Sequence, residues 1–188
     1  MEKLPINSRA PYFCLNDVND QPIDLEAFQG RKLLIGFFRH AGCPFCNLRV
    51  HNLVAIQDEL KQLGLDMVFF FESDRAVLQA SALHQNITSV PLIPDPTKDQ
   101  FDAYGLESSG RKVTLGHITS FVQTTLQAKL SKLPVHLMKG SESFKTLPAE
   151  FLVDESGVIR ELHYSQQLTD RIDLGLVREF AQRETVPL

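Results

Sequence analysis

Residues 37–49 read FFRHAGCPFCNLR, and they place two cysteines, Cys43 and Cys46, shortly after an apolar run that ends at Phe38. The run from Leu33 to Phe38 is typical of a strand that is buried on both faces of a sheet. Pro44 suits the first position of a helix, because its missing N–H is not needed there and its φ angle is already helical. The stretch therefore predicts a buried strand, a short loop and a helix capped by Cys43.

The C-x-x-C spacing predicts redox chemistry. At the N-cap, the sulfur of Cys43 faces unpaired N–H groups and the positive end of the helix dipole, which stabilise a thiolate. Cys46 lies three residues on, on the same face of the first turn, where the pair can form a disulfide and be released by exchange. The alternatives are half of a zinc site and two inert buried thiols. Zinc is disfavoured because Cys14 is the only other cysteine and no H-x3-5-H pattern follows.

Three further residues receive a role from these patterns. We expect Cys43 to be the more exposed thiol and the one with the lower pKa. Arg39 and His40 precede it in the loop, where a cation favours the thiolate and where His40 could shuttle a proton; a solvated loop position is the alternative for both. Cys14 lies in an apolar run, and we interpret it as a small core side chain.

Length and composition set broader limits. The 188 residues, 43% of them hydrophobic and 22% charged, suit one globular domain. The net charge of −4 argues against nucleic acid or an anionic membrane as a partner. The three cysteines and the lack of an apolar segment at the start favour a reducing compartment, and we expect the cytoplasm. No apolar run approaches the ~18 residues of a membrane helix.

The remaining patterns predict an α/β fold with a mixed central sheet and helices on both faces. The predicted strands are Ala10–Leu15 and Pro22–Leu25, which form an N-terminal β extension over about residues 8–30, then Leu33–Phe38, Leu65–Phe71, an edge strand at Val90–Ile93, and a hairpin of Glu150–Asp154 with Val158–Tyr164. The predicted helices are Pro44–Leu63, one from Ser73 or Asp74 to about Gln85, a short one that ends near Tyr104, and one from Asp170 to about Arg183.

The segment of residues 106–147 carries an apolar stripe at helical spacing that includes Leu115, Ile118 and Val122. We interpret it as a helical insertion within the single domain. Because such a stripe must be buried, we expect it beside the active-site crevice or at a subunit contact, with simple packing on the domain flank as the alternative.

Three segments carry a resemblance to a known family: Ala10-Pro11-Tyr12-Phe13 with Leu15, residues 37–46 with Cys-Pro-Phe-Cys, and residues 147–154 with Gly157-Val158-Ile159. With them the chain resembles the thioredoxin-fold, peroxiredoxin-like proteins, the family of alkyl hydroperoxide reductase and thiol-specific antioxidant proteins. The resemblance implies that Pro148 is a cis proline opposite the cysteine pair; a trans proline that only starts a strand is the alternative. It also implies that the peroxide-attacking cysteine is Cys46, whereas the helix-cap argument favours Cys43.

The resemblance implies a thiol-dependent oxidoreductase with an antioxidant role, in which Cys43 and Cys46 cycle between dithiol and disulfide with no organic cofactor and no metal. The implied substrate is a peroxide or a disulfide, and the implied electron donor is a thioredoxin- or glutathione-type reductant; a homodimer is compatible with it. The alternatives are a general thiol-disulfide reductase without peroxidase activity and a non-catalytic thioredoxin-fold binding module.

The sequence departs from the family's peroxidase pattern, which is Pro-x-x-x-Thr-x-x-Cys plus an arginine across the site. If Cys43 attacks, Gly36 stands at the proline position and His40 at the threonine position. If Cys46 attacks, Arg39 stands at the proline position and Cys43 at the threonine position. The arginine position falls on Pro148. We therefore expect slow oxidation by peroxide and comparatively competent disulfide exchange, unless Arg39 or Arg49 compensates from a new direction.

Overall fold

A five-stranded mixed sheet with the strand order β5-β4-β3-β6-β7 forms the centre of the molecule. The computed structural model describes residues 2–81, 87, 89–106 and 146–184. The strands of this sheet are β3 (Lys32–Phe38), β4 (Leu65–Phe71), β5 (Leu92–Pro94), β6 (Ala149–Val153) and β7 (Ile159–Tyr164). β3, β4 and β5 are parallel, whereas β6 and β7 pair antiparallel. The predicted fold class is confirmed, and β5 lies at one edge of the sheet, as the sequence indicates.

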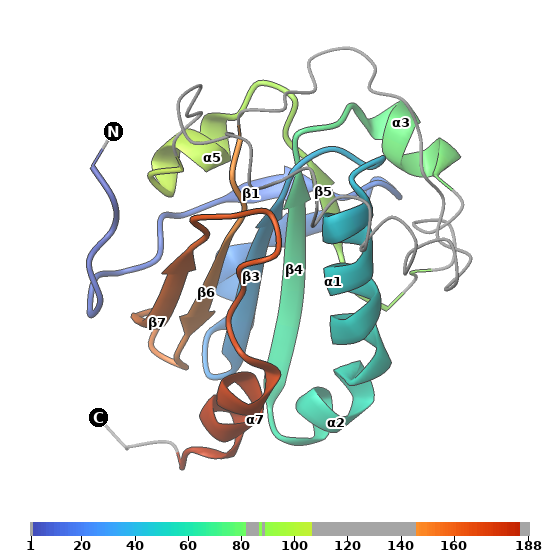
Figure 1. Ribbon diagram of the computed structural model, residues 1–188. Helices are drawn as coiled ribbons and strands as arrows, with labels where there is room; N and C mark the ends of the chain where they lie inside the picture. Colours follow the sequence, from blue (N-terminus) through green and yellow to red (C-terminus); the bar gives the residue numbers. More distant parts are fainter. Residues whose placement is uncertain (1, 82–86, 88, 107–145, 185–188) are drawn as a thin grey trace.

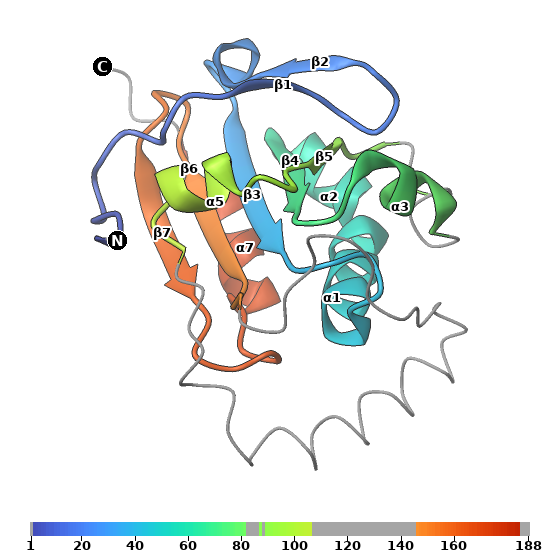
Figure 2. The ribbon, with the colours of Figure 1, turned by 90° about the horizontal axis from the view of Figure 1, so that it is seen from above.

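Helices cover one face of the sheet, and the N-terminal segment covers the other (Figures 1 and 2). The helices of the first face are α1 (Pro44–Ala55), α2 (Gln57–Gln62) and α7 (Leu174–Gln182). The opposite face carries the two-stranded sheet of β1 (Cys14–Asn16) and β2 (Pro22–Asp24), the 3-10 helix η1 (Leu25–Phe28) and α5 (Asp99–Ala103). The short helix α3 (Arg75–Ala80) follows β4, at the end of the sheet where α1 begins.

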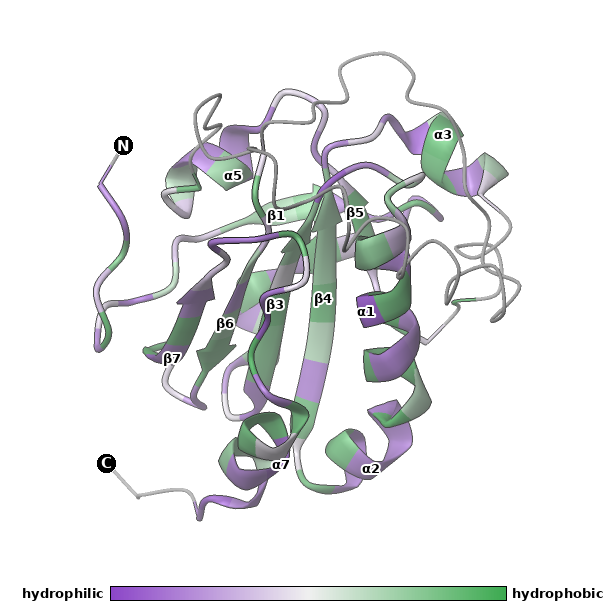
Figure 3. Ribbon diagram, in the orientation of Figure 1, coloured by the Kyte–Doolittle hydropathy of each residue, from purple (hydrophilic) through white to green (hydrophobic). Residues whose placement is uncertain are grey.

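Each face of the sheet has its own apolar core. Strand β3 is buried along its whole length and alternates between the two cores: Leu34 and Phe38 face α1, while Ile35 and Phe37 face the N-terminal segment. Figure 3 shows that β3 and most of β4 consist of hydrophobic residues, whereas the helices that cover them carry both hydrophobic and hydrophilic residues. Because β3 is buried along its whole length, the loop that follows it, residues 39–43, begins at a fixed position.

Two predicted helix bounds are wrong. The helix predicted over Pro44–Leu63 is interrupted at Ile56, whose N–H donates to Leu53 three residues back in a tighter turn (3.2 Å). The last helix begins at Leu174 and is capped by Asp173, which accepts the N–H of Gly175 (2.8 Å). Asp170 does not cap it, because its carboxylate already accepts the N–H of Gln166 within the preceding loop (2.9 Å).

Two further predictions, for Cys14 and for the end of the helix after β4, are wrong, and a third lies outside the described residues. Cys14 is exposed, not a core residue, because β1 places Leu15 toward the sheet and its two neighbours outward. The helix capped by Asp74 ends at Ala80, and Ser81 is already extended, so the predicted end near Gln85 is wrong. The helical insertion predicted over residues 106–147 lies almost entirely outside the described residues, so it stays a prediction.

The close packing around Gly36 in β3 yields a stability prediction. An added Cβ there would lie 2.8 Å from the ring of Phe38 and 3.1 Å from that of Phe69. We expect Gly36→Ala to lower the free energy of unfolding by about 1–3 kcal/mol through overpacking, measured by urea denaturation. In a Phe38→Leu background the same substitution should cost less, because the leucine vacates part of that space. Equal costs in both backgrounds would contradict this explanation.

Candidate active site

The loop after β3 is fixed by hydrogen bonds that place Cys43 at the start of α1. The N–H of Ala41 donates to Oγ of Ser73 (2.8 Å), and Nδ2 of Asn47 donates to the carbonyl of Ala41 (2.9 Å). The N–H of Cys43 donates to the carbonyl of His40 (2.9 Å), and Cys43 is the N-cap of α1 with Pro44 in its first turn. The local geometry predicted from the C-P-F-C motif is therefore confirmed.

Both thiols of the motif are free and buried. Cys43 is 1% exposed and Cys46 is 0% exposed, and both belong to the apolar cluster beneath the helical face of the sheet. The expectation that Cys43 is the exposed thiol is therefore wrong, because the loop of residues 39–42 is itself buried and covers the start of the helix. At 1% exposure, Cys43 offers almost no surface for contact with another folded protein.

The environment of Cys43 favours its thiolate. Burial alone raises the pKa of this thiol, but a hydrogen bond from the Cys46 thiol, the charge of Arg39, the backbone N–H of Cys46 and the charge of Arg171 outweigh it and lower the pKa to about 6. Cys43 is therefore mostly a thiolate at neutral pH.

Cys46 has the opposite tendency. Burial and the neighbouring Cys43 sulfur, which accepts its proton and is negatively charged, raise the pKa of Cys46 well above its ordinary value. The two thiols thus differ in protonation: Cys43 favours the thiolate, and Cys46 favours the neutral thiol beside it. This asymmetry supports the assignment from the helix cap and not the one implied by the family register.

Arg39 and His40 are both buried, so the solvated alternative for these residues is wrong. Nη1 of Arg39 lies 3.9 Å from Sγ of Cys43, where its charge acts on the thiolate. Burial and the charge of Arg39 lower the pKa of His40 to about 4, although the carboxylate of Glu72 opposes this. His40 is therefore neutral at neutral pH, and it does not supply the cation that the sequence pattern suggested.

Arg49 does not face the cysteine pair as a free cation. Its guanidinium binds both carboxylate oxygens of the fully buried Glu150 in β6 (2.7 and 2.8 Å) and the carbonyl of Ile172 (2.8 Å). Glu150 also accepts the N–H of Ile172 (3.1 Å). The pair therefore ties α1, β6 and the loop before α7 together next to the cysteines.

Arg171 is a site residue that sequence reasoning missed. It lies in the loop between β7 and α7, and its side chain is 8% exposed. Its charge helps to lower the pKa of Cys43 and partly opposes the rise in the pKa of Cys46. Nothing local in the sequence signals this, because more than 120 residues separate it from the cysteines and only the sheet brings them together.

Pro148 precedes β6 at the site, but it is not a cis proline. The backbone of the described residues contains no cis peptide bond, so the conformation implied by the family resemblance is wrong. The carbonyl of Pro148 accepts the N–H of Ser165 (3.0 Å), which extends the pairing of β6 with β7 by one step. Leu147 packs on the apolar cluster that contains both cysteines, so this segment does line the site.

A second buried carboxylate borders the loop. Glu72, directly after β4, pairs with Lys98 (2.9 Å) and accepts the hydroxyl of Thr146 (2.9 Å). Its N–H donates to the carbonyl of Arg39 (3.2 Å). This contact fixes the first residue of the loop against the neighbouring strand.

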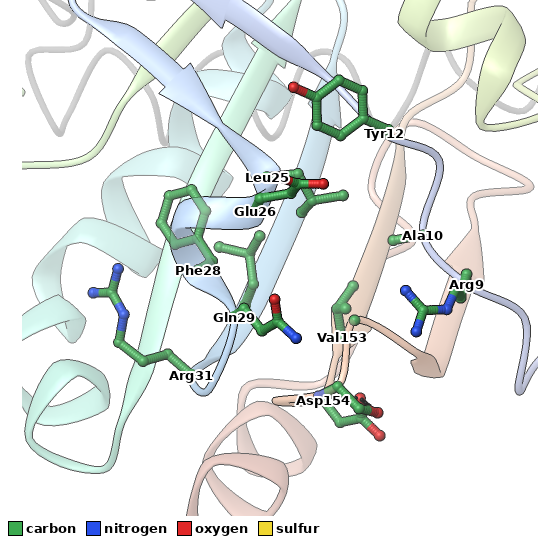
Figure 4. A pocket seen from close by; sticks show the side chains of 13 residues that line it. Arg9, Ala10, Tyr12, Leu25, Glu26, Phe28, Gln29, Arg31, Val153 and Asp154 are labelled. Atoms are coloured by element: carbon green, nitrogen blue, oxygen red, sulfur yellow. Dashed lines mark hydrogen bonds between the residues drawn. The ribbon is translucent and has the colours of Figure 1, made fainter.

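A cavity of about 220 Å³ lies at the other end of the sheet (Figure 4). It is lined by Arg9, Tyr12 and Phe28 of the N-terminal segment together with Leu33 and Val153, whereas the cysteines follow the far end of β3. Its volume is below the roughly 300–1,000 Å³ of typical ligand pockets. This cavity is not part of the redox site.

The part of the chain that the structure describes offers neither a metal site nor a membrane-spanning helix. Its His, Cys, Asp and Glu side chains nowhere gather in groups of three that could hold a metal ion. Likewise, none of its helices has the length and apolar character needed to cross a membrane.

The thiol assignment can be tested by alkylation. In a Cys14→Ser background we expect Cys43→Ser protein, in which only Cys46 remains, to react with iodoacetamide only at alkaline pH, because burial raises the pKa of Cys46. The Cys46→Ser protein should react at much lower pH, since Arg39 and Arg171 still lower the pKa of Cys43. Faster reaction of Cys46 below neutral pH would reverse the roles.

The buried ion pair yields a second test. We expect Glu150→Gln to lower the free energy of unfolding by about 3–5 kcal/mol, because it leaves the guanidinium of Arg49 buried without its counter-charge. The double variant Arg49→Met/Glu150→Leu should be more stable than either Arg49→Met or Glu150→Leu, since both charges are then absent. A double variant as unstable as the sum of the two would show that the ions do not act as a pair.

Comparison with known proteins agrees with this arrangement. The AhpC/TSA family matches residues 6–162. The peroxiredoxin Bcp of Escherichia coli K12 is 29% identical over 126 residues, which cover 65% of this chain and 80% of that protein.

Solved structures share the fold at low identity. A thiol peroxidase from Chromobacterium violaceum superposes with a TM-score of 0.63 at 16% identity, covering 96% of this chain and 88% of that one. A protein from Chlorobium tepidum assigned as a thiol:disulfide interchange protein gives a TM-score of 0.63 at 17% identity, covering 96% and 100%. The two neighbours differ in assigned chemistry, so the likeness shows the thioredoxin fold alone. From the family match, the chain belongs to the AhpC/TSA family of thioredoxin-fold, peroxiredoxin-like proteins and is a thiol-dependent oxidoreductase.

Proposed function

We propose that the chain reduces small hydroperoxides, with Cys43 as the attacking thiolate and Cys46 as the resolving thiol. The observation that carries this proposal is the low pKa of a fully buried Cys43 beside the neutral Cys46. A stable thiolate is the form that attacks peroxide, and a neighbouring thiol is the group that then closes a disulfide.

The cycle has three balanced steps. The thiolate of Cys43 attacks one oxygen of the hydroperoxide; the O–O bond breaks, Cys43 becomes a sulfenic acid, and the other oxygen leaves as an alcohol or water after taking a proton. The sulfur of Cys46 then attacks the Cys43 sulfur, which forms the disulfide and releases water. A thioredoxin- or glutathione-type thiol donor restores the two thiols by exchange.

Burial of the pair favours a small oxidant over a protein disulfide, which reverses the comparatively competent disulfide exchange expected from the sequence. Exchange with a protein disulfide needs in-line contact between sulfurs, and Cys43 is only 1% exposed. A hydroperoxide group is small enough to reach a sulfur that a folded protein does not touch. General disulfide reduction is the second candidate, since the adjacent C-x-x-C pair also suits exchange. The chain would act in a reducing compartment such as the cytoplasm, where such donors are present.

Stopped-flow oxidation tests the proposal. Reduced protein in a Cys14→Ser background is mixed with hydrogen peroxide, an organic hydroperoxide or a model protein disulfide, and free thiols are counted. We expect either peroxide to remove both remaining thiols without an intermolecular cross-link, and to react faster than the protein disulfide. Because neither sequence register supplies the family's threonine and arginine, the second-order constant should stay below about 10⁷ M⁻¹s⁻¹.

Control variants separate the steps. With Cys46→Ser, peroxide should consume Cys43 alone and leave a sulfenic acid that dimedone traps; with Cys43→Ser, oxidation should be lost. Faster reaction with the protein disulfide would promote the general reductase, and unchanged thiols with all three oxidants would support the binding module. A constant above about 10⁷ M⁻¹s⁻¹ would overturn the expectation of slow oxidation.

A further inference from the structure

The loop between β7 and α7 brings a second guanidinium to the cysteine pair. The side chain of Arg171 is 8% exposed, and the next residue, Ile172, packs in the same apolar cluster as Cys43 and Cys46. In Figure 1 this loop passes beside the sheet on the side of the helices. Arg171 is therefore a buried cation on the same face of the sheet as the two sulfurs.

The nitrogen atoms of Arg171 are only partly used. Nη1 donates to Oγ of Ser165 (3.1 Å) and to the carbonyl of Asp170 (2.6 Å), which fixes the side chain. Nε and Nη2 are buried and form no hydrogen bond with any residue that the structure describes. Buried guanidinium N–H groups without an acceptor are rare and call for an explanation, such as a ligand that is absent.

The nearest carboxylate does not take this role. Nε of Arg171 is 3.9 Å from Oε1 of Glu150, which is beyond hydrogen-bond distance. Both oxygens of Glu150 are already bound by Arg49, and one of them also accepts the N–H of Ile172. One carboxylate thus serves two guanidinium groups, and a positive charge with free donors is left for another anion or oxygen acceptor.

We propose that Arg171 is a catalytic residue that binds the hydroperoxide, donating from Nη2 to the oxygen that leaves when the O–O bond breaks. The inference rests on the proposed function, because it assigns a partner to the oxygen in the first step of that cycle. As that oxygen gains negative charge, the guanidinium stabilises it, and it then takes a proton and departs as alcohol or water. The donor comes from the β7–α7 loop. The position just before β6, where the family pattern has its arginine, is Pro148 in this chain.

The test must separate this contact from an effect on the thiolate alone. Other charged or titratable groups near Cys43 are Cys46, Arg39 and His40 beside it, Glu72 after β4, and the Arg49–Glu150 pair, all of which stay unchanged. The reaction of Cys43 with hydrogen peroxide and with iodoacetamide is measured from about pH 5 to 10 in a Cys14→Ser background. Iodoacetamide needs the thiolate but has no peroxide oxygens to bind, so it reports ionisation only.

For Arg171→Met we expect the pH midpoint of both reactions to rise, because a cation that favours the thiolate is lost. At the high-pH plateau, where Cys43 is fully ionised, iodoacetamide should react at the wild-type rate, while hydrogen peroxide should react about 10²-fold more slowly. Arg171→Lys keeps the charge but lacks the planar fork, and should lose at least about 10-fold at the peroxide plateau. The control is Arg178→Met, which removes an exposed arginine of α7 that pairs with Glu59 of α2. This variant should match the wild type in both reactions.

A wild-type peroxide plateau in Arg171→Met would overturn the inference, as would equal losses with both reagents, which would indicate a structural role. Thermal unfolding checks that each variant is folded; if Arg171→Met is not, Arg171→Lys decides, and a wild-type peroxide plateau in it overturns the inference. Failure of the proposed function is distinguishable, because the unsubstituted protein would then not be oxidised by peroxide at all.

Discussion

The rest of the site depends on how a negatively charged sulfur is kept in a buried position. Burial disfavours the thiolate of Cys43, and its pKa is nevertheless about 6 because the thiol of Cys46, the guanidinium of Arg39 and that of Arg171 act against burial. These three groups come from the first turn of α1, the end of β3 and the loop before α7. The charge on one sulfur is therefore balanced only when three separate elements are folded against each other.

Glu150 provides the framework for that arrangement. It lies in a central strand at 0% exposure, and it holds a guanidinium on α1 and a backbone N–H in the β7–α7 loop. A buried ion pair is weak evidence for stability, because apolar residues of similar volume are often as good or better. What the pair supplies here is position: it keeps the helix with Cys46 and the loop with Arg171 in a fixed relation to the same strand.

The parts of this structure that sequence predicts are those set by local rules. The apolar run ending at Phe38 and the N-cap at Cys43 with Pro44 each follow from a few neighbouring residues. The errors concern properties set by the tertiary environment. The neutral state of His40 and the burial of Cys43 depend on what packs over the loop, and the position of Arg171 depends on the pairing of β6 with β7. The choice of Asp173 over Asp170 as a cap depends likewise on hydrogen bonds within a loop.

The same charge balance has a consequence for the proposed cycle. The buried cysteine pair must be reached twice in each cycle, first by the oxidant and then by a larger thiol donor. When Cys43 and Cys46 form a disulfide, Arg39 and Arg171 lose the negative charge of the Cys43 thiolate, and this loss makes the burial of positive charge less favourable. Contact with water lowers that cost, so the oxidised pair gains less from burial than the reduced pair does. The interactions that make Cys43 reactive when reduced are thus also the ones that favour access to the disulfide once it has formed.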